Sequence, residues 1–383
     1  MAVQPAREGR TPETAGRPAP SRFAPNQEIR FCRAADGTRL AYAIHGSGPP
    51  LVVVSCWLSH LQYDWQSPVW RHFLDDLGRI ATVVRYDERG YGMSDWDVDD
   101  FSLPARLGDL ESVLDATGFE TFALLGMSGG SSVAMAYAIA HPERVSRLVL
   151  YGTVRGRPPI WSDEQWAEEQ TYRSMIQVGW ARSDPEFRRF FTRRFIPDAT
   201  EEQMRWFDDL QRMSTSAGNM LASRVSRQQE DIVADLPKIS APTIVLQARG
   251  DRSTPFDCAV SVSSLIPGAR LVPMESRNHI LLADEPAWRV FIDEVTKFME
   301  PDRRAFEEQA RVGRPTTEAL SERELDVLRL AAEGRTNDGI AAALSLSPRT
   351  VERHLSNVYG KLGLTGRAAR AAAVAEYLRG RLA

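Results

Sequence analysis

The sequence has 383 residues, of which 43% are hydrophobic and 26% charged, and its formal net charge is −4. This length favours two domains and supplies ample apolar material for a sizeable core. The chain contains no run of about 18 apolar residues, so we expect no membrane partner, and its negative charge argues against a protein that coats nucleic acid.

The N-terminal region and the cysteines carry little functional information. Residues 1–24 are rich in Pro, Gly, Arg and Thr and lack the apolar stretch of a signal peptide, which predicts a disordered segment. Cys32, Cys56 and Cys258 lie far apart, neither paired by a motif nor spaced like metal ligands. We therefore expect a protein of the reducing cytoplasm with no metal site, and no motif predicts a cofactor.

Residues 25–300 alternate short apolar, β-branched runs with amphipathic stretches. The segment Phe31–Gly46 is predicted to form a hairpin with Asp36-Gly37 as its turn. Because helical patterns separate most of the later strands, they should form a mostly parallel sheet in an α/β fold. The strands predicted after the hairpin are Leu51–Ser55, Thr82–Tyr86, Thr121–Leu125, Arg147–Tyr151, Thr243–Gln247 and Arg270–Pro273.

The region from about 155 to 236 has no strand pattern and is predicted to be helical. An all-helical insertion after a sheet strand should cap the carboxyl edge of the sheet, where ligands bind in open α/β folds. Its aromatic residues either line an apolar pocket or form the helix core, and the sequence favours neither; four of them are Trp161, Trp166, Trp180 and Trp206. Its clustered arginines are interpreted as a solvated helix face rather than a carboxylate site; they are Arg188, Arg189, Arg193 and Arg194.

A serine follows the predicted strand Thr121–Leu125 in the sequence GMSGG. This G-x-S-x-G pattern places Ser128 on a sharp turn between a strand and a helix. Asp251 and His279 each follow a later predicted strand, which completes the chain order Ser, Asp, His. In such a triad the histidine takes the serine proton and the aspartate fixes the imidazole tautomer. The pattern therefore predicts a catalytic site.

Together with the segment RYDERGYGMSD, these residues resemble the α/β-hydrolase superfamily over about 29 to 300. The resemblance implies an α/β-hydrolase fold with a helical cap, and oxyanion donors at Gly129 and in the loop after the strand Leu51–Ser55. That loop commonly shows His-Gly in the family, but here it continues as Cys56-Trp57, so the Trp57 N–H is the second candidate donor. Loss of one donor costs about 3 kcal/mol of transition-state stabilisation. A triad that binds a ligand without useful turnover therefore stays an alternative. Cys56 is either a reactive thiol or, as we favour, a small buried residue.

Residues 301–316 are charged, lack a strong apolar period and end in Gly-Arg-Pro, which predicts a linker. Residues 317–383 are predicted to contain four helices and no strand. Ser321 and Glu324 form a capping box at the start of the first helix, and the second begins near Asn337. After the turn Ser345-Leu346-Ser347, the third helix begins at Pro348, because Pro fits a position that needs no N–H.

The third helix has an apolar stripe and an outward polar face. Val351, Leu355, Val358 and Leu362 repeat at helical spacing, and from Gly339 onward basic side chains outnumber acidic ones by seven to two. Two short helices joined by three residues, the second with a polar and basic N-terminal half, fit the major groove of double-stranded DNA. Arg and Asn side chains read base edges, whereas Thr, Ser and Lys suit phosphates.

The segment LSERELDVLRLAAEGRTNDGIAAALSLSPRTVERHLSNVYGKLGLTGR resembles the LuxR-type helix-turn-helix family, also known from FixJ- and NarL-like response regulators. The resemblance implies DNA contacts from the third helix and a homodimer contact through a final helix, Arg367–Leu378. Gly339 and Glu352 depart from the family pattern. The candidate DNA-binding residues are Arg349, Thr350, Val351, Arg353, His354, Asn357 and Lys361.

Two functions from different classes follow from these patterns. In the first, a DNA-binding transcriptional regulator senses, and in one form hydrolyses, a small and mostly apolar ligand in its hydrolase-like domain. In the second, the protein is a serine hydrolase acting on an ester or acyl bond, and the DNA module serves a secondary role. The intact triad favours the serine hydrolase. The unusual Ser-Cys sequence of the loop after the strand Leu51–Ser55 favours the ligand-sensing regulator.

Overall fold

The computed structural model describes residues 27–154, 162–312 and 320–381, apart from 363, 365 and 367. The predicted disordered segment 1–24, Trp161 and the end of the predicted linker lie outside these residues. The chain divides into two compact units between Arg303 and Arg304, and each unit is described by itself. No helix within the described residues has the length and hydropathy that crossing a membrane requires.

A mixed sheet forms the centre of the first unit. Among the described residues its eight strands lie in the order β1-β2-β4-β3-β5-β6-β7-β8. The pairs β1–β2 and β2–β4 are antiparallel and the others are parallel, which confirms the predicted hairpin and α/β fold. The strands are β1 Glu28–Arg33, β2 Arg39–Gly46, β3 Pro50–Val54, β4 Thr82–Tyr86, β5 Phe122–Met127, β6 Val145–Tyr151, β7 Thr243–Ala248 and β8 Arg270–Met274.

Helices cover both faces of the sheet because its strands bury alternate residues on opposite sides. On β3, Leu51 and Val53 join the core that includes α2 (Arg71–Ile80) and α10 (Pro286–Val312), whereas Val52 and Val54 join the core on the other face. That second core includes side chains of α3 (Leu103–Thr117), α4 (Gly130–Ala140) and α9 (Phe256–Leu265). A short helix, α1 (Leu61–Asp64), precedes α2. Helix α10 continues to Val312, so residues 301–312 of the predicted linker are helical.

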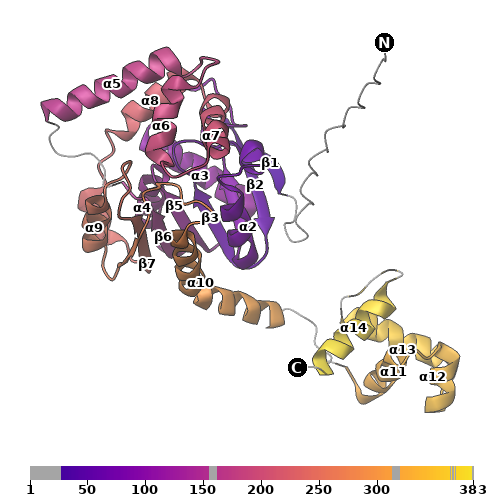
Figure 1. Ribbon diagram of the computed structural model, residues 1–383. Helices are drawn as coiled ribbons and strands as arrows, with labels where there is room; N and C mark the ends of the chain where they lie inside the picture. Colours follow the sequence, from indigo (N-terminus) through magenta and orange to yellow (C-terminus); the bar gives the residue numbers. More distant parts are fainter. Residues whose placement is uncertain are drawn as a thin grey trace, which may run out of the picture. The chain divides into compact units, whose positions relative to one another are not determined.

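Between β6 and β7 the described residues form four further helices, which gather at one side of the sheet (Figure 1). They are α5 Asp163–Gly179, α6 Glu186–Phe195, α7 Glu201–Ser214 and α8 Ala217–Arg227, and a 3-10 turn η1 (Val233–Lys238) follows them. We call α5–α8 the cap. Capping boxes at Ser162 and Thr200 begin α5 and α7, which explains why these amphipathic segments start where they do.

The cap tryptophans separate into different roles. Trp180 is buried and donates its indole N–H to the Thr215 carbonyl at 3.0 Å, so it belongs to the helix core. Trp206 stacks on Tyr63 with ring centroids 4.8 Å apart, and Trp166 is 45% exposed. Helix core is therefore the correct interpretation for Trp180, and none of these three lines the cavity described below.

Within the described residues four helices follow α10, as predicted. They are α11 Glu322–Ala332, α12 Asn337–Leu344, α13 Pro348–Lys361 and α14 Ala369–Arg381, so the last helix begins two residues later and ends three residues later than expected. Ser347 accepts the N–H of Thr350, and the capping box of Ser321 and Glu324 is formed. Val351, Leu355 and Val358 are buried. Local capping and the apolar stripe thus explain the positions of α11–α13.

Candidate functional site

Ser128 lies on a sharp turn between β5 and α4. Its φ is 49°, a left-handed conformation that L side chains rarely adopt and that costs about 1–3 kcal/mol. Its N–H donates to the carbonyl of Tyr151, on the neighbouring strand β6, at 2.8 Å. The strained backbone holds the serine at the carboxyl edge of the sheet, as a G-x-S-x-G turn requires.

The glycines on either side of this turn allow its close packing. A Cβ at Gly126 would lie 2.7 Å from Ala134 Cβ, and one at Gly130 would lie 2.3 Å from the carbonyl oxygens of Val54 and Ser55. Real Cβ atoms do not approach so closely, so α4 can pack against β5 and the end of β3 only when both positions are glycine. This is the physical reason for the small residues in the pattern.

Asp251 and His279 form a buried pair beyond the ends of β7 and β8. His279 Nδ1 lies 2.6 Å from Asp251 Oδ2, and the residues are 2% and 6% exposed respectively. Asp251 Oδ1 accepts the N–H groups of Ser253 and Thr254. Burial alone would raise the pKa of Asp251, but His279 and these hydrogen bonds lower it below its usual value. The carboxylate is therefore charged and accepts the Nδ1–H of the imidazole, which leaves Nε2 as the proton acceptor.

The segment at the end of β6 contacts both parts of the predicted triad. The carbonyl of Tyr151 accepts the Ser128 N–H, and the Tyr151 hydroxyl donates to the His279 carbonyl at 2.6 Å. A Cβ at Gly152 would lie 2.8 Å from His279 Cε1. The structure thus brings Ser128, Asp251 and His279 to one edge of the sheet, although they are separated along the chain.

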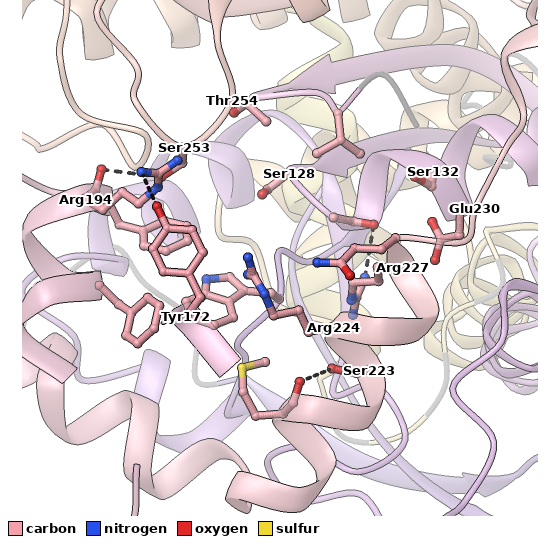
Figure 2. A pocket seen from close by; sticks show the side chains of 17 residues that line it. Ser128, Ser132, Tyr172, Arg194, Ser223, Arg224, Arg227, Glu230, Ser253 and Thr254 are labelled. Atoms are coloured by element: carbon pink, nitrogen blue, oxygen red, sulfur yellow. Dashed lines mark hydrogen bonds between the residues drawn. The ribbon is translucent and has the colours of Figure 1, made fainter. Parts of the chain in front are cut away.

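A cavity of about 290 Å³ lies over Ser128 (Figure 2). Trp57 stacks on Phe195 with ring centroids 4.9 Å apart, and Phe195 contacts the His279 ring edge-on at 5.1 Å. The apolar walls therefore adjoin the triad directly, and the cavity accommodates a small ligand with an apolar body. Its apolar and aromatic lining residues are Trp57, Val154, Tyr172, Phe191, Phe195 and Met220.

The two candidate oxyanion donors both line this cavity. Gly129 and Trp57 contribute to its wall next to Ser128. Cys56 is buried, its thiol contacts the Leu58 carbonyl at 3.4 Å, and burial raises its pKa to about 12. Because a thiol with such a pKa stays protonated, the packing role is the correct interpretation of Cys56. Within the described part of the chain, no three His, Cys, Asp or Glu side chains are grouped so as to hold a metal ion.

Helix α8 supplies cavity residues that the sequence patterns did not identify. Met220, Ser223, Arg224 and Arg227 line the cavity, at the spacing of one helix face. Arg227 Nη1 donates to the carbonyl of Gly129 at 3.1 Å, and its Nη2 bonds to the carboxylate of Glu88. The helical spacing was readable in the sequence, but only packing selects which face of α8 meets the nucleophile turn.

The solvated-face interpretation of the α6 arginines is wrong at two positions. Arg188 is buried and donates to the backbone carbonyls of Trp180, Arg182 and Asp208 at 2.7–2.9 Å. Arg194 lines the cavity. The sequence could not separate these arginines because an interior polar role depends on carbonyls supplied by other segments. Arg189, half-buried, pairs with Asp208 and Glu201, whereas Arg193 is exposed.

The predicted DNA-binding residues lie on different surfaces of α13. Four are exposed, namely Arg349, Arg353, Asn357 and Lys361, and Thr350 and His354 are half-buried. Val351 is fully buried in the core, so its side chain has a packing role. Lys361 Nζ lies 2.7 Å from Glu324 Oε2. Burial alone would raise the pKa of Glu324, but the hydrogen bonds from Lys361 and Ser321 lower it to about 2. Lys361 therefore ties α13 to α11.

Comparisons with known proteins agree with this division of the chain. Residues 49–286 match the model of the alpha/beta hydrolase fold, and residues 318–374 match that of the luxR family of bacterial regulatory proteins. The AB hydrolase superfamily protein YisY of Bacillus subtilis is 26% identical over 247 residues, which cover 61% of this chain and 86% of that protein.

Two further relatives match the first unit. A 2-hydroxy-6-oxononadienedioate/2-hydroxy-6-oxononatrienedioate hydrolase of Cupriavidus pinatubonensis is 28% identical over 253 residues, with 61% of this chain and 78% of that protein covered. Among solved structures, a hydrolase from Pseudomonas aeruginosa PA01 superposes with a TM-score of 0.60 at 26% identity, covering 71% of this chain and 98% of that one. The fold and its hydrolase relatives are thus established for the larger unit.

Proposed function

This chain belongs to the alpha/beta hydrolase fold family and carries a luxR-family domain at residues 318–374, and on that premise we propose that it is a transcriptional regulator whose first unit binds and hydrolyses a small, mostly apolar acyl compound. One observation carries the proposal for the first unit. Asp251 and His279 form a buried pair, with Oδ2 of the aspartate 2.6 Å from Nδ1 of the histidine. This pair adjoins an apolar cavity, and Ser128, whose backbone is strained, lines the same cavity.

The chemistry follows from the roles of these groups. Ser128 Oγ attacks the carbonyl carbon of an ester, and His279 Nε2 accepts the serine proton. The carboxylate of Asp251 stabilises the imidazolium that forms, and the N–H groups of Gly129 and Trp57 stabilise the oxyanion. His279 then protonates the leaving alcohol, and a water molecule activated by the same histidine releases the acid and restores Ser128.

The regulatory part of the proposal uses the cap. Cavity residues come from α5, α6 and α8, so a bound ligand contacts most of the cap. A ligand shifts a conformational equilibrium only when it binds two states with different affinity. We place this action in the cytoplasm, in a homodimer held through α14, whose Leu378 is 44% exposed. The alternative, a serine hydrolase whose DNA module is secondary, differs in lacking this coupling.

A fluorophosphonate probe tests both parts of the proposal. The probe should bond covalently to Ser128 in the full chain, identified by the peptide mass, and should not label Ser128→Ala. Because the tetrahedral phosphonyl adduct that forms when Ser128 displaces fluoride mimics the tetrahedral intermediate of ester hydrolysis, the labelled protein should bind DNA from its own upstream region with an affinity changed several-fold. Labelling without any change in DNA affinity would favour the hydrolase alternative, and absence of labelling would refute the acyl chemistry.

Arg353 tests the DNA-binding face. Arg353→Ala should weaken binding of specific DNA by about 1–3 kcal/mol, because an exposed arginine on α13 is suited to read a guanine edge. The measurement is a fluorescence anisotropy titration at fixed salt with specific and unrelated duplexes. Arg329→Ala, on the exposed surface of α11, is the matched control and should change specific binding little. An unchanged affinity for Arg353→Ala would exclude this arginine from base recognition.

A further inference from the structure

Two arginines from different cap helices line the cavity beside one tyrosine. Arg194 of α6 and Arg224 of α8 lie 5.4 Å and 5.1 Å from the centre of the Tyr172 ring, which belongs to α5. Arg194 Nη1 also donates to the Tyr172 hydroxyl at 2.9 Å. Figure 2 shows Arg194 and Tyr172 together at one side of the pocket and Arg224 below Ser128 in the same view. Three helices thus concentrate positive charge on a mostly apolar cavity.

The guanidinium of Arg224 is held in place by a buried carboxylate. Its Nε lies 3.1 Å from both oxygens of Glu169, and its Nη2 lies 2.6 Å from Oε2. Glu169 is 2% exposed. Within the described part of the chain, the guanidinium uses only Nε and Nη2 in hydrogen bonds, so Nη1 can donate to a ligand. An arginine held in this way binds an anion with little further loss of side-chain entropy.

Arg224 shares the carboxylate of Glu169 with a second arginine, so one of the two positive charges has no matching negative charge in this group. Arg173 Nε also donates to this carboxylate at 2.8 Å, so one negative charge serves two arginines. Burial alone would raise the pKa of Glu169, but Arg224 and Arg173 lower it, so the carboxylate stays ionised. The group of Arg173, Glu169 and Arg224 therefore carries one surplus positive charge.

The other charges around the cavity are matched. Arg227 pairs with Glu88, and Arg106 pairs with Glu230, in a buried cluster of two arginines and two glutamates. Arg194 lies 3.7 Å from Glu168. Among the described ion pairs at the cavity, the surplus thus belongs to the group of Arg173, Glu169 and Arg224, of which Arg224 lines the cavity. A single surplus charge matches a carboxylate better than a doubly charged phosphate monoester.

We propose that the acyl compound taken by this cavity is a monoanion, with a carboxylate bound by Arg224 and Arg194 and an apolar body between that carboxylate and the carbonyl attacked by Ser128. The inference rests on the proposed acyl site and names its substrate class. Trp57, Phe191 and Phe195 pack against the apolar body. The two arginines bind the carboxylate through charge-assisted hydrogen bonds, which are stronger than neutral ones.

Calorimetric titration of full-length Ser128→Ala tests the proposal without requiring turnover. The ligands are 4-nitrophenyl hydrogen adipate, an anion at pH 7, and its neutral match methyl 4-nitrophenyl adipate. We expect the anion to bind roughly tenfold more tightly, as a charge-assisted hydrogen bond permits. Adding Arg224→Met should bring the ratio of the two affinities close to one, whereas Arg224→Lys should keep part of the preference.

Arg193→Met in the same background is the control, because Arg193 is exposed on α6 and does not line the cavity. It should keep the full preference for the anion. Equal affinities for the two ligands, a preference that survives Arg224→Met, or failure of the anion to bind would each overturn the proposal. If the anion is preferred but the wild-type protein hydrolyses neither ester, the proposed hydrolysis fails and the monoanion site stands.

Discussion

Replacement of Ser128 with alanine should lower the kcat for hydrolysis of a short-chain ester by about 10⁴- to 10⁶-fold, the range seen when a triad serine is removed. The loss is expected because no other hydroxyl occupies the strained turn, where φ is 49°. Alanine and serine meet the same backbone strain there, so the melting temperature should change little. The measurement is release of 4-nitrophenolate from 4-nitrophenyl butyrate.

Ser132→Ala is the matched control for this experiment. Ser132 also lines the cavity, but it belongs to the first turn of α4 rather than to the nucleophile turn. Its removal should change kcat by less than about tenfold, because it contributes no covalent chemistry. If Ser128→Ala keeps activity within tenfold of wild type while Ser132→Ala does the same, hydrolysis does not use Ser128 and its assignment as the nucleophile is wrong.

Asp251→Asn should lower kcat by about 10⁴-fold, because the wrong imidazole tautomer is then favoured. The backbone N–H groups of Ser253 and Thr254 both donate to Asp251 Oδ1, so the amide oxygen must occupy that position. The amide NH₂ would then face His279 Nδ1, which lies 2.6 Å from Oδ2 in the native protein. A donor there favours the tautomer with its proton on Nε2, which cannot accept the serine proton.

The pH dependence of kcat and a surface control complete this test. In Asp251→Asn the remaining activity should rise further toward high pH than in the wild type, as hydroxide deprotonates the serine. Asp257→Asn makes the same substitution at an exposed position of α9 and should leave kcat unchanged. A kcat for Asp251→Asn within tenfold of the wild-type value would rule out the assigned role of the aspartate.

Much of the fold was predictable because the sequence patterns that indicate its strands and helices involve residues close together in the chain. The alternation of Leu51, Val52, Val53 and Val54 between two faces follows directly from strand geometry. Ser321 with Glu324, and Ser347 before Pro348, satisfy the first N–H groups of their own helices, so they determine where α11 and α13 begin. The G-x-S-x-G pattern and the chain order together singled out Ser128, Asp251 and His279, because each follows a strand that ends at the same edge of a parallel sheet.

The sequence by itself therefore determined the type of each domain, the identity of the predicted triad and the polar face of α13. Only the tertiary structure decided which face of α8 brings Arg224 and Arg227 to the cavity, and that Arg188 is buried against backbone carbonyls. It also decided that Lys361 pairs with Glu324. The physical reason is that capping and periodicity act within a few residues, whereas a long polar side chain takes its role from partners that distant segments supply.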